Sequence, residues 1–346
     1  MDDDPVRRVG GAMVDMGRSG ALPDTSVIVV GCGVVGLTTA ITLQEAGFAV
    51  RIWSAEPPAD TTSIIAGATW FPYKAYPLDR VLEWARVSKP VFVEMAADPA
   101  TGVAVRDCLH LYRDPVDLVP WWASTVPDLR RVPEAELPDG FRDSYFFTQP
   151  VIDMPIYLDY LLDRFRAGGG EVHLREVTSL AEPAEAAAIV VNCTGLRARE
   201  LAGDTGVVPV RGQWVRVENP GIDRCIADFD HPGGVTYVIP RLGSLLLGGT
   251  GDENAWDTEP DPRVAEEIVA RCAELDPRLA HARVLEHRAG LRPVRPAGVR
   301  LEEEALPGGG VCVHNYGHGG AGVTLSWGCA AEAARLVGAA ADRGGR

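Results

Sequence analysis

The feature that most constrains the fold of this chain is a glycine-rich turn that directly follows a short apolar run. Val27–Val30 is β-branched throughout, which is typical of a buried strand in a parallel sheet. The turn, Gly31–Gly36, reads GCGVVG, and Leu37–Ala46 then shows apolar residues at helical spacing. A second strand is expected over Phe48–Trp53. Together these segments predict a βαβ unit of about 30 residues.

The three glycines have the spacing that a dinucleotide pyrophosphate requires. Gly31 permits the tight turn, Gly33 lets the backbone approach the pyrophosphate, and Gly36 allows the helix to pack closely on the strand. The helix begins near Val34 and Val35, where free N–H groups and a partial positive charge face the phosphates. We expect these five residues to bind the cofactor.

Two further segments narrow the choice of cofactor. Glu56 lies 20 residues beyond Gly36, and we expect it to bind the adenosine ribose hydroxyls. The glycine motif alone does not separate NAD from FAD. Val311–Thr324, however, reads as a strand, a second glycine-rich loop and a helix start. A second helix N-terminus against a flavin ring stabilises the anionic reduced flavin, which favours FAD.

The strand pattern between these loops predicts two interleaved domains. From Val208 onward short alternating strands are typical of antiparallel sheet, whereas βαβ pieces lie at both ends and in the middle of the chain. The expected fold class is α/β, with a Rossmann-like FAD-binding domain interleaved with an α+β substrate domain built on a largely antiparallel sheet. The expected boundaries are a flexible tail over 1–24, an FAD-binding domain over 25–90, 150–205 and 288–340, and a substrate-binding domain over 91–149 and 206–287.

Charge and cysteine content exclude several partners. The 33 Lys and Arg against 48 Asp and Glu give a net charge of −15 without a basic run, which argues against a nucleic-acid partner. The longest apolar stretch, Val27–Leu43, is interrupted by glycines, and residues 1–24 lack the apolar core of a signal peptide. The seven cysteines are scattered without a CxxC pair, which is typical of reduced thiols in a cytoplasm. We expect no membrane contact and no metal.

A resemblance to a known family rests on eight blocks of sequence. In order they are GCGVVG (Gly31–Gly36), TTSIIAGATWFPY (Thr61–Tyr73), VVNCTGL (Val190–Leu196), PVRGQ (Pro209–Gln213), YVIPR (Tyr237–Arg241), LLLGGT (Leu245–Thr250), GLRPVRP (Gly290–Pro296) and HNYGHGGAGVTLSWGCA (His314–Ala330). With these blocks the chain resembles the D-amino-acid oxidase family of FAD enzymes, which includes the D-aspartate oxidases. The resemblance implies hydride transfer from a D-amino acid to flavin N5, giving a 2-oxo acid, ammonia and, with dioxygen, hydrogen peroxide.

The same resemblance implies roles for single residues. Arg292 would grip the substrate carboxylate through two hydrogen bonds, and Tyr237 would donate a third. The carbonyl of Gly320 would accept from the substrate amine. The remaining matched positions would contact the flavin: Thr61, Thr62, Ala66, Gly67, Thr69, Val177, Cys193, Thr194, Gly317, Gly319, Gly320, Ala321, Gly322, Val323 and Thr324. No residue is implied as a catalytic acid or base, so catalysis rests on orientation.

The sequence departs from the family pattern at the second active-site tyrosine. Members carry it just before the YVIP strand or just after GGT, where this chain has Pro232–Val235 and Gly251. The chain also ends without a peroxisomal tripeptide, and its basic residues are almost all arginine. We therefore expect a bacterial cytoplasmic enzyme, active as a monomer or homodimer on neutral or apolar D-amino acids.

Several alternatives stay open at this point. A D-aspartate oxidase needs a second cation, for which His231, Arg241 and Arg211 are candidates. A glycine- or sarcosine-type amine oxidase has the same fold. An NAD-dependent dehydrogenase and a flavin-binding protein without turnover come from other functional classes.

Overall fold

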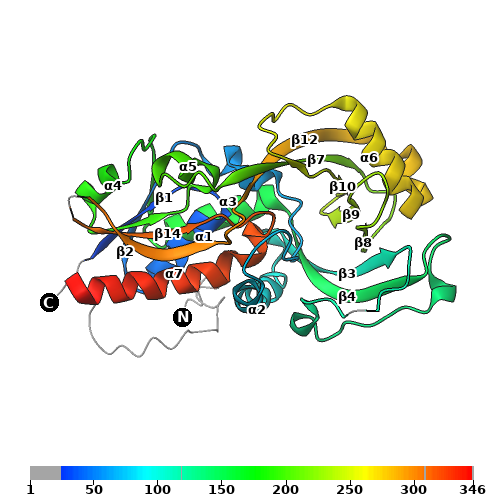
Figure 1. The fold of residues 1–346 in the computed structure, drawn as a ribbon, viewed down its shortest axis with the longest axis horizontal. Helices are drawn as coiled ribbons and strands as arrows, with labels where there is room; N and C mark the ends of the chain where they lie inside the picture. Colours follow the sequence, from blue (N-terminus) through cyan, green and yellow to red (C-terminus); the bar gives the residue numbers. More distant parts are fainter. Residues whose placement is uncertain (1–24, 118, 308, 345–346) are drawn as a thin grey trace, which may run out of the picture.

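The computed structural model describes residues 25–117, 119–307 and 309–344, and its strands form two sheets that lie side by side (Figure 1). The expected tail over 1–24 lies outside the described residues. The first sheet has the order β13 (Arg300–Ala305), β14 (Val311–Tyr316), β6 (Ile189–Asn192), β1 (Ser26–Val30), β2 (Ala49–Ser54) and β5 (Glu171–Leu174). All its pairs are parallel except that of the edge strand β13 with β14.

Helices cover both faces of this first sheet. The side chains of β1 alternate, so that Val27 and Val29 pack toward α1 (Val34–Glu45) and α7 (Gly322–Gly344). Ile28 and Val30 pack on the opposite face, in a cluster that includes residues beside α4 (Ala181–Ala186). Burial on both faces explains why β1 reads as a continuous apolar run rather than an alternating one.

Helix α7 is the long helix that runs along one face of the first sheet in Figure 1, and two neighbouring helices pack against it. It packs on α1 and on α2 (Leu78–Met95), while α3 (Met154–Ala167) packs on α1. The approach of α7 to α2 requires a glycine, because a Cβ at Gly328 would lie 2.3 Å from the Trp84 carbonyl oxygen. The cofactor loop before α7 is therefore anchored by a well-packed helix.

The second sheet carries the other half of the site. Its order is β11 (Asp252–Glu253), β7 (Val208–Glu218), β10 (Ser244–Gly248), β9 (Thr236–Arg241), β8 (Cys225–Asp228), β3 (Val103–Tyr112) and β4 (Asp143–Ile152), with β12 (Val284–Val294) also paired to β7. Every pair is antiparallel except β3 with β8. Helix α6 (Pro262–Leu275) covers one face through an apolar cluster. The opposite face of this second sheet contributes residues to the cavity described below.

The expected α/β fold class is confirmed, with a mostly parallel sheet and a largely antiparallel one built from interleaved segments. The expected domain boundaries at 90, 150 and 288 fall inside α2, β4 and β12, and the division into domains stays a prediction. A domain boundary inside a strand would divide one ladder of hydrogen bonds between two domains. Among the described residues, no helix combines the length and apolar character needed to cross a membrane.

Candidate active site

A cavity of about 470 Å³ lies where the two sheets meet. Loops that follow β1 and β6 form one wall, and β3, β8, β9 and β12 contribute the other. All the site residues expected from the sequence line this cavity except Gly36, Gly317 and Ala321. Residues separated by almost 300 positions in the sequence, such as Gly31 and Thr324, thus reach one site.

The dinucleotide turn has the geometry that its glycines predict. Gly31 has a φ of +106°, and a Cβ there would lie 2.6 Å from the Cys193 carbonyl oxygen. Gly36 lies behind the cavity wall, where a Cβ would lie 2.0 Å from the Gly31 carbonyl oxygen. Its part is therefore the close packing of helix on turn, rather than contact with a ligand.

The N-terminus of α1 is open to an anion. Its N-cap is Gly33, which provides no side-chain hydrogen bond. The N–H of Val34 donates to the Ser63 hydroxyl at 3.0 Å, and both residues line the cavity. Uncapped helix N–H groups attract phosphate. Sequence reasoning missed Ser63 because the segment around it carries no regular pattern.

Three expected cofactor residues follow parallel strands of the first sheet and line the cavity: Glu56 after β2, Val177 after β5 and Cys193 after β6. Glu56 is exposed on the cavity wall, and the Ser54 hydroxyl holds its turn by donating to the Glu56 carbonyl at 2.8 Å. Val177 and Cys193 line the same wall. Burial raises the pKa of the Cys193 thiol to about 12, so this thiol is no nucleophile at neutral pH.

The C-terminal glycine loop brings the start of α7 to the cavity. Gly319, Gly320, Gly322, Val323 and Thr324 line it, whereas Gly317 and Ala321 lie behind and hold the shape of the loop. The Thr324 hydroxyl donates to the Phe71 carbonyl at 3.0 Å and accepts from the Phe71 N–H at 3.1 Å. This pair of bonds joins the C-terminal loop to the segment that contains Thr61–Thr69.

Two unpaired polar atoms show that this wall suits a flavin. Asn315 and His318 are buried side chains on the cavity wall. Asn315 Oδ1 and His318 Nε2 have no hydrogen-bond partner among the described residues. Buried polar groups are destabilising unless a ligand or water satisfies them. An isoalloxazine ring, with its row of donors and acceptors, fits this need, as the uncapped helix N-terminus fits the pyrophosphate.

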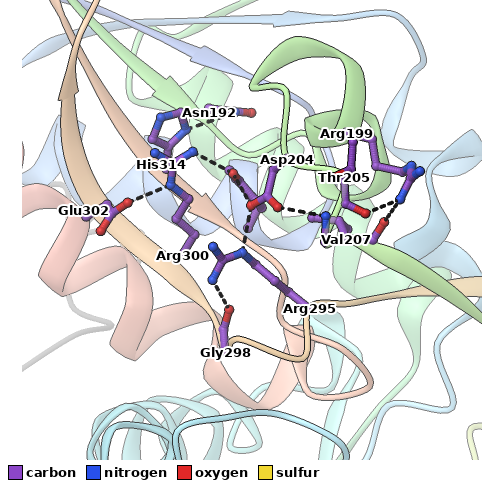
Figure 2. A network of polar contacts seen from close by, with 12 residues as sticks. Asn192, Arg199, Asp204, Thr205, Val207, Arg295, Gly298, Arg300, Glu302 and His314 are labelled. Carbon is purple, nitrogen blue, oxygen red and sulfur yellow. Dashed lines mark hydrogen bonds and ion pairs between the residues drawn. The ribbon is translucent and has the colours of Figure 1, made fainter.

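A polar network behind the cavity fixes Thr194, which lines it (Figure 2). Asn192 accepts hydrogen bonds from the Thr194 N–H at 3.2 Å and hydroxyl at 2.7 Å. The Asn192 amide lies 3.2 Å from His314 Nδ1, and His314 Nε2 lies 2.9 Å from Glu304. Burial and the Arg300 charge lower the pKa of His314, so its neutral ring accepts from Asn192 and donates to Glu304.

The same network includes Arg295, the second arginine of the GLRPVRP block, and accepts its hydrogen bonds. Its Nε donates to Asp204 at 2.7 Å, and its Nη1 donates to the Gly298 carbonyl at 3.0 Å (Figure 2). The Tyr316 hydroxyl also donates to Asp204, at 2.9 Å. Arg295 therefore holds the turn beside Gly317 and is not available to a substrate.

Arg292, the first arginine of that block, is held differently. Its guanidinium lies over Gly212, where a Cβ would come within 2.3 Å of Nη1, and Nη1 donates to the Thr250 carbonyl at 3.1 Å. No carboxylate of the described residues forms an ion pair with Arg292. The other arginine on the cavity wall, Arg197, is paired with Glu176 at 2.7 Å. Arg292 is thus the unpaired cation of the described wall.

Tyr237 lies within electrostatic reach of Arg292. Burial raises the pKa of the Tyr237 phenol, and the Arg292 charge opposes that rise. The cross-strand partner of Tyr237 is Gly248, and a Cβ there would lie 2.0 Å from Tyr237 Cζ. The tyrosine ring therefore lies across the neighbouring strand because that strand has a glycine at this position.

Tyr73 is a site residue that sequence reasoning missed as such. Its ring centre lies 5.9 Å from Arg292 Cζ, and a Cβ at Gly320 would lie 2.5 Å from its Cδ1. Its hydroxyl lies 3.7 Å from the Cβ position of Gly251, one of the two places where the family resemblance implies a second tyrosine. A second aromatic hydroxyl thus reaches this place from another segment, which the end of the block TTSIIAGATWFPY alone does not reveal.

The candidates for a second cation do not reach the cavity. His231 lies 3.2 Å from Glu274, and Arg241 donates to the Ala66 carbonyl at 2.7 Å. Arg211 donates to the carbonyls of Asp257 and Glu259. None of the three lines the cavity. Within the described part of the chain, no group of three or more His, Cys, Asp or Glu residues could hold a metal ion.

Comparison with known proteins agrees with this geometry. Residues 26–336 match the family described as DAO, FAD dependent oxidoreductase. The chain belongs to this family. It is 58% identical to a D-amino-acid oxidase of Rubrobacter xylanophilus over 313 residues, which cover 90% of this chain and 96% of the relative. It is 51% identical to a D-amino-acid oxidase of Streptomyces coelicolor, over 91% of this chain and 97% of the relative.

The fold of this family member is shared with more distant proteins. A glycine oxidase from Bacillus cereus superposes with a TM-score of 0.74 at 19% identity, covering 91% of this chain and 95% of that chain. The family confirms FAD as the cofactor and oxidoreductase as the class. The resemblance found from the eight sequence blocks is thereby confirmed, and the NAD-dependent alternative is set aside.

Proposed function

We propose that this chain is a D-amino-acid oxidase that takes neutral substrates. The observation that carries the proposal is Arg292, a guanidinium without an ion-pair partner among the described residues, which lies within electrostatic reach of Tyr237 on the same cavity wall. A single free cation matches the single carboxylate that all α-amino acids share. The high identity to two curated D-amino-acid oxidases supports the same reading.

The residues of this chain bind and orient the substrate. Arg292 holds the carboxylate through two parallel N–H donors, with Thr250 and Gly212 fixing the plane of its guanidinium. Tyr237 donates a further hydrogen bond, and the Gly320 carbonyl accepts from the substrate amine. FAD, which the residues of the cavity wall would hold, would supply the two-electron acceptor for the α-hydrogen, and dioxygen would reoxidise it. The imino acid released adds water and yields a 2-oxo acid and ammonia.

No side chain of the cavity wall is required as an acid or base. Burial lowers the pKa of His110 to about 3 and that of His318 to about 4, so both rings are neutral at physiological pH. Orientation of the Cα–H bond over the flavin then provides the main part of the rate enhancement.

The absence of a second cation favours neutral D-amino acids over D-aspartate. His231, Arg241 and Arg211 have structural partners away from the cavity, so a second carboxylate would be buried without a counter-charge. A glycine-type oxidase stays the alternative, because a glycine oxidase has the same fold. The two differ in whether longer D-amino acids are turned over.

We further propose dioxygen as the second substrate and a bacterial cytoplasm as the location. All seven cysteines are buried and free, which supports a reducing compartment. A monomer or homodimer is the expected quaternary state, and sedimentation of the flavin-loaded protein tests it.

The test is peroxide release from the purified flavoprotein with matched D- and L-amino acids. We expect activity with D-alanine and other neutral D-amino acids and none with their L-enantiomers. D-Aspartate should be oxidised at least 100-fold less efficiently, because its side-chain carboxylate finds no partner. Activity confined to glycine and sarcosine would support the alternative, and a yellow protein silent to every amino acid would refute the proposal.

A further inference from the structure

Part of the cavity wall is formed by six residues that we call the inner lobe: Phe71, Cys108, His110, Gln149, Cys225 and Phe229. The pairing of the strands shows where this lobe lies relative to Tyr237. His110 on β3 pairs with Ala227 on β8, and Ala227 pairs with Tyr237 on β9. Paired residues share a face of the sheet, so His110 and Tyr237 point the same way from backbones about 10 Å apart. The small side chain of Ala227 between them leaves the space open.

The two polar residues of the lobe are buried and unsatisfied. His110 is 3% exposed and Gln149 is 2% exposed. Neither His110 Nδ1 nor Gln149 Oε1 has a hydrogen-bond partner among the described residues. Both residues line the cavity. Polar atoms in such positions are destabilising unless a ligand or ordered water pairs with them.

Aromatic rings fix the position of the imidazole. The His110 ring centre lies 5.3 Å from that of Phe71, 4.8 Å from that of Phe147 and 5.1 Å from that of Phe229, each at a steep angle. This packing prevents the ring from turning away toward solvent, and burial lowers its pKa to about 3. The lobe therefore offers a neutral imidazole in a fixed place.

Gln149 reaches the lobe from the neighbouring strand. Thr69 is bridged to Val151 in antiparallel fashion, and the Trp70 N–H donates to the Pro150 carbonyl at 2.9 Å. That register brings Phe71 alongside Gln149. The Phe71 ring, whose backbone lies opposite Gln149, has its centre 5.3 Å from that of the His110 ring.

The lobe carries no charge of its own. The charged side chains on the described cavity wall are Glu56, Arg197 and Arg292, all outside the lobe as defined. A cation or carboxylate entering it would lose its hydration without gaining a counter-ion. A neutral group that donates and accepts hydrogen bonds would satisfy both unpaired atoms.

We propose, resting on the proposed function, that the inner lobe receives the substrate side chain and that His110 and Gln149 select long D-amino acids with a neutral hydrogen-bonding end. The carboxamide of D-glutamine is the representative of this class. Its carboxylate lies on Arg292, and its side chain extends past Ala227 to the two polar groups. An apolar chain of equal length fills the lobe but leaves both polar atoms unpaired.

The test compares kcat/KM for D-glutamine, D-norleucine, D-glutamate and D-alanine in the flavin-loaded enzyme. D-Glutamine should exceed D-norleucine at least tenfold, because one hydrogen bond changes an equilibrium by roughly that factor. D-Glutamate should be at least 100-fold poorer than D-glutamine. In Gln149→Leu and in His110→Phe, the ratio of D-glutamine to D-norleucine should fall to about one.

Controls distinguish a failure of this proposal from a folding defect in a variant and from a failure of the proposed function. Gln44→Leu makes the same chemical change at a glutamine that bonds the Phe165 and Gly168 carbonyls away from the cavity, and it should keep the wild-type ratio. Flavin content reports folding of each variant. A wild-type ratio near one, or a ratio unchanged in both lobe variants, overturns this proposal while D-alanine oxidation sustains the proposed function. Failure of D-alanine as well refutes the proposed function itself.

Discussion

At the scale of single residues, the site depends on a guanidinium that has no carboxylate partner among the residues that the structure describes. Arg292 is oriented by a carbonyl and a glycine, not by an acid, so its charge is available to a ligand. Arg295, three residues later, instead forms an ion pair with Asp204. The resemblance carried by the block GLRPVRP already selects Arg292, and the network behind the cavity shows that Arg295 is paired with Asp204.

We expect Arg292→Ala to raise KM for D-alanine about 100-fold or more, because two charge-assisted hydrogen bonds are lost. Flavin should stay bound, since Arg292 contacts no residue of the dinucleotide turn. Steady-state kinetics and the visible spectrum measure the two effects. The matched control is Arg283→Ala, an exposed arginine paired with Glu218, which should behave as wild type. Wild-type kinetics in Arg292→Ala would show that the carboxylate lies elsewhere.

A smaller effect is expected at Tyr237. Tyr237→Phe removes one hydroxyl and keeps the ring over Gly248, so KM should rise by about tenfold with flavin content unchanged. Kinetics with D-alanine check the value. If Tyr237→Phe leaves KM unaltered, Tyr73, whose hydroxyl lies near Gly251, is the hydroxyl that serves the substrate.

At the scale of secondary-structure elements, close contacts between backbones decide where the cofactor loops can lie. Gly36→Ala places a Cβ 2.0 Å from the Gly31 carbonyl oxygen and must push α1 off the turn. We expect the variant to lose FAD during gel filtration. Gly338→Ala is the control, since a Cβ there meets nothing within 4 Å and the residue lies within α7. It should keep FAD and gain roughly 0.5–1 kcal/mol of stability. Retention of FAD by Gly36→Ala would contradict the packing assigned to this glycine.

The elements themselves were predictable to different degrees. The first βαβ unit was predictable because apolar runs and glycine spacing are local signals. Strand β13 was not, since Arg300–Ala305 is largely charged and forms a sheet edge that pairs only with β14. The inner lobe was also not predictable, because its polar residues come from β3 and β4 and meet only through the register of the second sheet.

At the scale of the whole molecule, buried histidines make stability depend on pH. The folded-state pKa of His110 is about 3 and that of His318 about 4, below the ordinary 6.5. Between those values and pH 6.5 the unfolded chain binds more protons, so stability falls as pH decreases. Each histidine contributes up to about 1.4 kcal/mol per pH unit in that window. Above pH 6.5 their contribution is constant.

Urea unfolding of the flavin-loaded protein at pH 7 and at pH 5 checks this expectation. The free energy of unfolding should be lower at pH 5 by about 2–4 kcal/mol. His318→Gln, which does not titrate, should reduce that difference. Equal stability at the two pH values would show that neither ring is buried as a neutral base.

The arrangement of the two sheets also explains how far sequence alone could go. The glycine loops and the arginine block are short motifs, and they were sufficient to indicate FAD and a carboxylate. The cavity needs both sheets at once, and residues such as Ser63 and Tyr73 join it only through the fold. Composition does not mark the ends of helices and strands, so the expected domain boundaries fall inside α2, β4 and β12.

The site and the family together imply that the chain passes electrons from a D-amino acid to its own flavin. The most direct measurement is anaerobic mixing of the purified yellow protein with D-alanine or L-alanine while the flavin absorbance is recorded. We predict rapid and complete bleaching with D-alanine, none with L-alanine, and return of the colour with peroxide when dioxygen is admitted. Absence of bleaching with D-alanine and with every other neutral D-amino acid would contradict the account.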